Sequence, residues 1–296
     1  MSQWDGKSKG TLLGYKIFVF LIQKAGVRAA YSLLLFVAFY YFLFYPKSFS
    51  SIYYYLRFRQ KYSALRAFFG VYRVYFVFGQ TIIDKVAISA GLRDKFTYEF
   101  DGIETLKEAL AAERGGILIS AHVGNFEIAD KFFADIDVNF QINLVTAGQE
   151  RTIIKAYMEE IAGGSSVKFI TIKDDLSHVF EINDALSKNE LICFTGDRYY
   201  EGSKTLEADF LGAPASFPAG PFHIASRLSV PVIFVYVMKE KNLHYHLYAR
   251  RATQVKRRDV QTYLDAYTAS VAQIVMRYPL QWFNFFDFWH TKKESR

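Results

Sequence analysis

The stretch GGILISAHVGNFEIAD, from Gly115 to Asp130, decides the fold because an apolar run in it stops abruptly at polar residues. The run Ile117–Leu118–Ile119 follows a Gly-Gly pair and consists of β-branched and aliphatic residues, which is typical of a buried central strand. Polar residues begin at Ser120, so we expect the strand to end near His122. The stretch therefore predicts a central strand that carries a histidine to the edge of a sheet.

A histidine and a carboxylate follow this strand at a spacing that requires a turn. His122 and Glu127 are five residues apart, which on a regular helix separates their side chains by about 140°. Gly124 and Asn125 both tolerate positive φ and can turn the backbone, so that a helix starting at Phe126 folds Glu127 back toward the imidazole. A carboxylate on one ring nitrogen fixes the tautomer and leaves the other nitrogen to accept a proton. The pattern predicts a general base and its orienting acid, and the alternative is a histidine that only satisfies a polar neighbour.

Composition favours a lipid partner over nucleic acid. Aromatic residues make up 18% of the 296 residues, with 29 Phe and 21 Tyr, and a membrane interface accepts such side chains as readily as a core does. The net charge of +7 indicates an anionic partner, and no nucleic-acid motif accompanies the basic residues. Cys193 is the single cysteine, which excludes an intrachain disulfide and fits a reducing compartment.

The N-terminal region contains two apolar blocks, Ile17 to Ile22 and Ala29 to Tyr45. The 17 residues of the second block span about 25 Å as a helix, slightly less than a hydrocarbon core of roughly 30 Å. The helix can therefore cross the membrane, re-enter it or lie embedded in it, and a buried core helix is the alternative. Basic residues flank the block on both sides, which suits a helix lying against one anionic leaflet. Met1 to Gly10 lacks a signal cleavage site, so we do not expect export.

Aromatic residues and arginines are mixed from Ser51 to Gly79, with a period that is closer to helical than to alternating. Amphipathic helices at the interface would bring these arginines to lipid phosphates, at roughly 1 kcal/mol for each basic residue. The alternative to lipid contact is that the aliphatic part of each arginine side chain covers a protein core while its guanidinium reaches water. We expect a membrane-associated segment over residues 1–50 and a single catalytic domain over residues 51–296.

The remainder of the chain alternates between strand and helix patterns, which predicts an α/β fold with a mixed or mostly parallel sheet flanked by helices. Besides the strand before His122, we expect strands at Phe96–Phe100, Ile142–Val145, Val167–Ile172, Leu191–Phe194, Pro231–Val237 and Leu243–Tyr248. We expect helices at Glu104–Glu113, Arg151–Ile161, Val179–Leu186, Phe222–Arg227 and Val260–Tyr278.

Asp197 and Arg198 follow the expected strand Leu191–Phe194, at the sheet edge where open α/β sheets bind ligands. A surface salt-bridge turn is the alternative. His244 and His246 would share one face of a strand, but no third ligand lies nearby, so we expect no metal site. The chain contains neither a G-x4-G-K-S/T loop nor a G-x-S-x-G elbow, so the usual signatures of ATP hydrolysis and serine-esterase chemistry are absent.

Three motifs resemble those of the late lipid A acyltransferases and their lysophospholipid acyltransferase-like relatives. SAHVGNFE, at residues 120–127, resembles the H-x4-D/E motif in its H-x-G-N-x-E form. GDRYYEGSK and FLGAPASFPAGP resemble the family's Asp-Gly block, and PLQW at residues 279–282 resembles its closing Pro-x-Gln-Trp motif. The resemblance runs from about Gly14 to Trp289 and implies that His122 is the base and Glu127 its orienting acid.

The resemblance also implies a site for the acceptor's phosphorylated head group. Asp197 and Gly202 match the more constant positions of the Asp-Gly block. The candidate basic contacts for the head group are Arg198, Lys204 and Arg227. Near the closing motif, an aromatic wall is expected from Trp282, Phe285, Phe286 and Trp289, with core packing as the alternative role.

The implied reaction is cofactor-free acyl transfer from an acyl carrier protein or coenzyme A thioester to a hydroxyl or amine of a lipid. It would occur at the cytoplasmic face of the inner membrane, with no acyl-enzyme and with oxyanion donors near Gly124 and Asn125. The acid is Glu rather than the Asp of glycerolipid acyltransferases, and residues 163–173 contain Lys168 but no arginine. Glycerolipid, aminolipid and polyene acceptors therefore stay open beside a lipid A precursor. The rival function is a catalytically inactive lipid-binding protein of the membrane surface.

Overall fold

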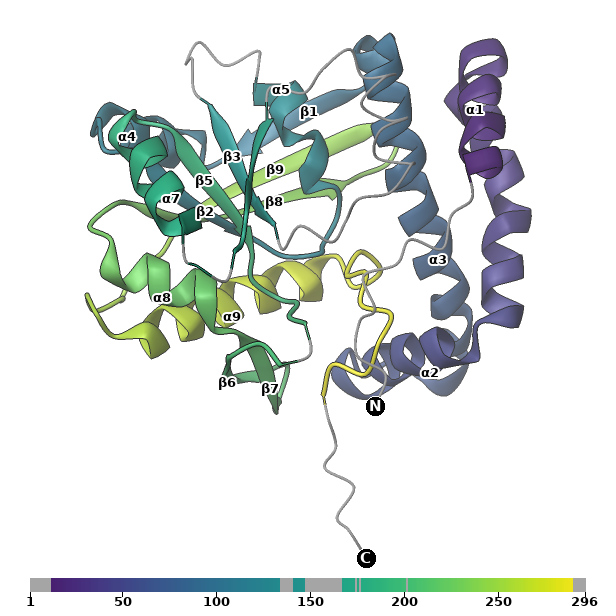
Figure 1. Ribbon diagram of the computed structural model, residues 1–296. Helices are drawn as coiled ribbons and strands as arrows, with labels where there is room; N and C mark the ends of the chain where they lie inside the picture. The colour runs from purple at the N-terminus through teal and green to yellow at the C-terminus, as the bar shows by residue number, and fades with distance from the viewer. Residues whose placement is uncertain are drawn as a thin grey trace, which may run out of the picture.

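The computed structural model describes residues 12–133, 141–146, 167–173, 175, 177–200 and 202–289. A central sheet separates two groups of helices, and a long helical pair stands at one end of it (Figure 1). The described helices are α1 (Leu12–Phe44), α2 (Pro46–Tyr54), α3 (Ala64–Ala87), α4 (Ile103–Ala111), α5 (Ala129–Phe133), α7 (Ser177–Ser187), α8 (Ala219–Arg227) and α9 (Val260–Arg277). The described strands are β1 (Thr97–Asp101), β2 (Gly116–Ser120), β3 (Ile142–Thr146), β4 (Val167–Thr171), β5 (Leu191–Thr195), β6 (Thr205–Phe210), β7 (Ala213–Pro218), β8 (Val232–Lys239) and β9 (His244–Arg251).

The main sheet has seven strands in the order β1-β9-β8-β2-β5-β3-β4. All its pairs are parallel except β8 with β9, so β1 and β9 run opposite to the other five strands. The predicted α/β class with a mostly parallel sheet is confirmed. The single antiparallel pair arises because a short turn joins β8 directly to β9, whereas a parallel pair needs a long crossover.

Strand β2 lies between β8 and β5, and all five of its residues are buried. Ile117 and Ile119 pack into the apolar core that includes α8 and α9, while Leu118 on the opposite face packs with α4. Both faces of β2 are therefore covered, which explains why the sequence shows a continuous apolar run instead of alternation.

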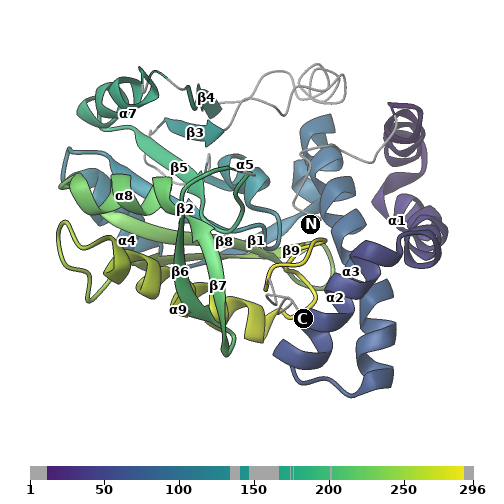
Figure 2. The ribbon, with the colours of Figure 1, turned by 60° about the horizontal axis from the view of Figure 1, so that its bottom comes forward.

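Helix α1 packs along α3, as both views show (Figures 1 and 2). The two helices contact the sheet where β8 ends and β9 begins. The two predicted apolar blocks form one helical element that is interrupted at Gly26, where φ is 82° and ψ is 172°. Within the described residues, Lys16–Phe44 is the one helix long and apolar enough to span a membrane, and core helices or signal sequences can pass the same test. The expected N-terminal apolar helical element is confirmed.

One hairpin was not predicted from the sequence, and one predicted helix falls on residues that the structure does not describe. Strands β6 and β7 form a separate antiparallel hairpin that the sequence patterns did not predict. Its turn residues Leu211 and Gly212 both have positive φ, and leucine is not a residue that signals such a turn. The helix expected at Arg151–Ile161 lies outside the described residues.

Candidate active site

The end of β2 is fixed by hydrogen bonds around Ser120. The Ser120 carbonyl accepts from the Gly196 amide at 2.9 Å and from the Tyr267 hydroxyl at 3.0 Å. The Ser120 hydroxyl donates to the Val235 carbonyl at 2.7 Å, and the residue is fully buried. These bonds hold β2, β5 and β8 together at the point where the chain emerges toward His122.

His122 is held against Asp197, which follows the end of the neighbouring strand β5. The distance from His122 Nδ1 to Asp197 Oδ1 is 2.7 Å, and the His122 amide donates to Asp197 Oδ2 at 3.0 Å. The indole N–H of Trp282 donates to the same Oδ2 at 3.2 Å. The Asp197 side chain is 4% exposed and that of His122 is 23% exposed. The pair thus consists of a buried carboxylate and a partly accessible imidazole.

Asp197 is kept ionised despite its burial. Burial raises the pKa of this carboxyl, but the His122 charge, the hydrogen bonds from His122 and the nearby Arg198 charge together lower the pKa below its usual value. An ionised Asp197 accepts a hydrogen bond from a protonated Nδ1 and stabilises positive charge on the imidazole. The geometry therefore supports the tautomer in which Nε2 is the nitrogen that accepts a proton.

Glu127, the predicted orienting acid, lies in the short 3₁₀ turn Phe126–Ile128 and forms an ion pair with Lys85 of α3. Both side chains are more than a third exposed, so this ion pair is at the surface, where such pairs contribute little to stability. The carboxylate bonded to Nδ1 is that of Asp197, a residue that the family resemblance places in the head-group block. The available signal was that both residues directly follow strands that proved to be neighbours.

Gly124 and Asn125 shape the turn after His122. Gly124 has φ of 57°, and a Cβ at this position would lie 2.0 Å from the Val237 carbonyl oxygen. Its amide donates to the Gln281 carbonyl at 2.8 Å, and the Asn125 amide donates to the Val237 carbonyl at 2.7 Å. Both expected oxyanion donors therefore already serve acceptors within the protein. Asn125 itself has φ of −141°, so of the two residues expected to tolerate positive φ only Gly124 adopts it.

The C-terminal segment closes over the site. The Phe283 amide donates to the His122 carbonyl at 2.9 Å, and the Arg198 guanidinium donates to the Phe283 carbonyl. Trp282 packs against Tyr55, Phe210 and Trp289 while its indole N–H bonds Asp197. Trp282 thus packs in the core and also contacts the candidate site, whereas the sequence predicts only a place in the aromatic wall.

The three predicted basic residues do not gather at one place. Arg198 lies next to Asp197, and Lys204 precedes β6 in an exposed position. Arg227 ends α8 close to Pro231, whose carbonyl accepts from the Ile117 amide at the beginning of β2. Arg227 therefore lies toward the edge of the sheet opposite His122.

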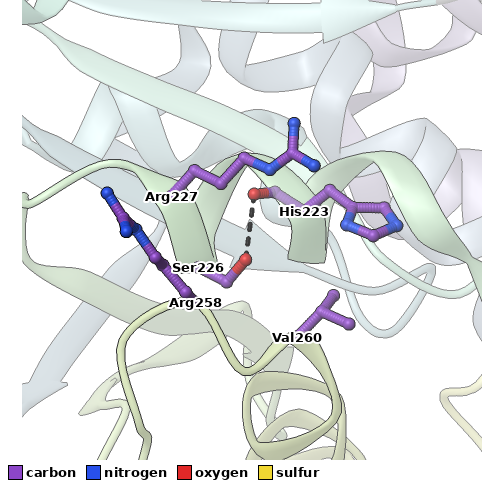
Figure 3. A pocket seen from close by; sticks show the side chains of 5 residues that line it. All are labelled: His223, Ser226, Arg227, Arg258 and Val260. Atoms are coloured by element: carbon purple, nitrogen blue, oxygen red, sulfur yellow. Dashed lines mark hydrogen bonds between the residues drawn. The ribbon is translucent and has the colours of Figure 1, made fainter.

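At that opposite edge, Arg227 lines a cleft of about 520 Å³ together with His223, Ser226, Arg258 and Val260 (Figure 3). The Ser226 hydroxyl donates to the His223 carbonyl at 3.1 Å, so it is engaged within α8. The cleft is basic, but its position separates it from the His122–Asp197 pair.

The described residues contain no group of three or more His, Cys, Asp or Glu side chains arranged to hold a metal ion. His246 Nδ1 lies 2.7 Å from a Glu99 oxygen, and His244 Nδ1 lies 2.8 Å from the Thr97 hydroxyl. The His-x-His pair thus contacts the edge strand β1. The one cysteine, Cys193, is buried in β5, and burial raises the pKa of its thiol to about 12.

Comparison with known proteins identifies a family. The family model described as bacterial lipid A biosynthesis acyltransferase matches residues 62–291, a range that includes His122, Asp197 and Trp282. A search of curated proteins finds no match.

Proposed function

Because this chain belongs to the bacterial lipid A biosynthesis acyltransferase family, and is therefore an acyltransferase acting on lipid A or a related lipid, we propose the finer features of its reaction from the site. In this proposal the enzyme moves a fatty acyl chain from an acyl carrier protein or coenzyme A thioester to a hydroxyl of a lipid A precursor or related lipid. The observation that carries the mechanism is the 2.7 Å contact between His122 Nδ1 and the buried Asp197 carboxylate.

In this mechanism His122 is the general base. Its Nε2 removes the proton from the acceptor hydroxyl, and the oxygen attacks the thioester carbonyl to give a tetrahedral oxyanion. Collapse breaks the carbon–sulfur bond, and the departing thiolate takes the proton back from the imidazolium. Asp197 stabilises that imidazolium and fixes its orientation. A base that both removes and returns the proton balances the reaction without a cofactor.

Direct transfer is supported by the burial of Ser120 in β2 and of Cys193 in β5. Ser120 is fully buried and its hydroxyl donates to the Val235 carbonyl. Cys193 is buried with its pKa raised to about 12, so little thiolate forms near neutral pH. Neither residue is placed to accept an acyl group.

The roles of Gly124 and Asn125 follow from their hydrogen bonds. Their amides would have to leave the Gln281 and Val237 carbonyls before they could stabilise an oxyanion. We therefore assign them to holding the turn, with oxyanion stabilisation requiring an exchange of these bonds when the thioester binds.

Membrane association is supported by the exposed apolar side chains of the N-terminal helices. Phe36 is 74% exposed and Leu65 is 73% exposed. Further large exposed apolar residues of α1, of the helical segment Tyr55–Arg59 and of α3 include Phe39, Leu43, Phe44, Phe58, Phe68 and Phe69. Exposed large apolar side chains on neighbouring helices are typical of an interaction surface, and arginines of the same segments suit anionic lipid. We propose that these helices place the enzyme at the cytoplasmic face of the inner membrane.

The alternative of a catalytically inactive lipid-binding protein would have no need of a base paired to a buried carboxylate, and the family match supports an acyltransferase instead. Lipid A precursors, glycerolipids, aminolipids and polyenes are the acceptor classes that an experiment must distinguish. Lipid mass spectrometry of a deletion strain would identify the acceptor and the chain length, since the missing species contains both.

Two matched amide variants decide which carboxylate orients His122. Asp197→Asn keeps the shape of the side chain but removes the charge that faces Nδ1, so we expect its turnover to fall on the order of 10²-fold or more. Glu127→Gln removes a surface ion pair with Lys85 and should cost less. Turnover is measured with an acyl thioester and a lipid extract, alongside thermal melting. The opposite ranking of the two variants would return the orienting role to Glu127.

A further inference from the structure

Four polar side chains form a buried cluster between α1, α3 and the strands β8 and β9. Asp84 of α3 accepts from Lys239 Nζ at 2.5 Å, from the Tyr245 hydroxyl at 2.5 Å and from the Tyr31 hydroxyl of α1. Lys239 also donates to the Tyr31 oxygen at 2.9 Å. The Asp84 side chain is 0% exposed and that of Lys239 is 7% exposed. The cluster is an ion pair within an otherwise apolar core.

Stability alone does not account for such a pair. Removing two charges from water costs several kcal/mol per ion, and well-packed apolar residues often serve a fold equally well. The best-attested use of buried polar groups is to fix one arrangement of packed elements. The hydrogen bonds that leave the cluster indicate which arrangement it fixes.

One route leads from the cluster to the turn that follows His122 through Tyr245. The Tyr245 oxygen accepts from Asn125 Nδ2 at 3.3 Å, and the same amide donates to the Thr81 carbonyl at 2.9 Å. Thr81 lies one turn before Asp84 on α3. The Asn125 side chain is thus held by the helix that supplies Asp84 and by the tyrosine that bonds to Asp84.

A second route starts from the main chain of Lys239. The Lys239 amide donates to Gln281 Oε1 at 2.9 Å, and Gln281 Nε2 donates to the Lys239 carbonyl at 2.7 Å. The Gln281 carbonyl in turn accepts from the Gly124 amide at 2.8 Å. Both members of the turn, Gly124 and Asn125, are therefore connected to the same buried ion pair.

We propose that Tyr31, Asp84, Lys239 and Tyr245 are positioning residues that hold the turn after His122 in its productive geometry and make that geometry depend on the seating of α1. Through Tyr31, the apolar helix that faces the membrane is joined to the catalytic turn. This inference rests on the proposed role of His122 as the base. It assigns α1 a part in assembling the active site beyond anchoring the chain.

The test compares two tyrosines of β9 whose hydroxyls lie on opposite faces of the sheet. Tyr245→Phe removes the link between Asp84 and Asn125 and keeps the ring. Tyr248→Phe is the matched control, because Tyr248 is equally buried and its hydroxyl pairs with that of Tyr278 at 2.8 Å, away from the cluster. Kinetics are measured on the full chain in detergent micelles, with palmitoyl-coenzyme A or palmitoyl-acyl carrier protein as donor, whichever the parent uses, and a lipid extract as acceptor.

We expect Tyr245→Phe to lower kcat on the order of tenfold with the donor KM within about twofold of the parent, since small misplacement of a reacting group is costly. Tyr248→Phe should retain the parent kcat even where its melting temperature falls by a similar amount. Equal kcat values for the two variants would overturn the proposal, because a merely structural role would not separate them.

Tyr31→Phe tests the connection to α1. We expect its kcat to fall about threefold or more while its recovery in the membrane fraction is unchanged, because α1 keeps its apolar surface. A parent-like kcat would overturn the part of the proposal that involves α1. The result for His122→Ala separates the two hypotheses: if that variant is active the proposed base is at fault, and if it is inactive while Tyr245→Phe matches its control, only the positioning role fails.

Discussion

At the scale of single residues, the sequence pointed to His122 because a polar residue type interrupts an apolar run at a predictable place. It did not identify Asp197 as the partner, because the two residues are 75 positions apart and meet only through the parallel pairing of β2 with β5. A local motif contains only residues that are close together in the sequence, so it indicated Glu127 as the acid. Trp282 was missed as a donor to Asp197 for the same reason.

Gly124 gives a prediction at this scale. Gly124→Ala places a Cβ 2.0 Å from the Val237 oxygen at a φ of 57°, so the turn must shift and activity should fall at least tenfold. Gly212→Ala, in the turn between β6 and β7, is the control, since Gly212 also has positive φ, 78°, but no described atom lies within 4 Å of the place that its Cβ would take. The control should lose about 1 kcal/mol of unfolding free energy and keep its turnover. Equal losses of turnover would show that backbone strain alone, without the clash, accounts for the effect.

At the scale of elements, strong apolar periodicity located most of the described helices and strands. The β6–β7 hairpin escaped because its turn uses Leu211 at a φ of 51°, where asparagine, aspartate or glycine is the usual signal. Helix α1 is interrupted at Gly26, between the two apolar blocks that the sequence indicates, and residues of both parts pack against α3.

Helix α1 carries the element-scale prediction. If the exposed apolar side chains of α1 and α3 enter the membrane, the full chain should stay in the membrane fraction in 1 M salt and be released by detergent. Salt screens charge contacts within a Debye length of about 3 Å at that concentration but leaves apolar burial intact. Fractionation followed by immunoblotting measures this. Release by salt alone would mean that basic residues provide the attachment.

At the scale of the whole molecule, strand patterns predicted an α/β sheet but could not predict the order β1-β9-β8-β2-β5-β3-β4. That order depends on pairing between distant strands, and it decides which residues reach the edge where β2 ends. Arg198, which follows Asp197 in the chain, lies at that edge, whereas Arg227 lies toward the opposite edge, although both are candidates for the same head-group site.

This arrangement gives a paired prediction for the head-group site. Arg198→Ala should raise the apparent acceptor KM more than it lowers kcat, because ground-state and transition-state binding of an anionic acceptor are both weakened. Arg227→Ala should leave the acceptor KM within about twofold of the parent. Steady-state kinetics over a range of acceptor concentration measures both. An acceptor KM raised only by Arg227→Ala would place head-group binding elsewhere than beside Asp197.

The most direct test of the account is thioester-dependent acylation by His122→Ala, measured alongside thermal melting. Removing a general base typically costs a factor of about 10² to 10⁴, so this variant should be nearly inactive. It should also melt like the parent, because the His122 side chain is partly exposed and lies outside the apolar core. A His122→Ala protein that folds normally and transfers acyl chains at a rate comparable to the parent would contradict the mechanism.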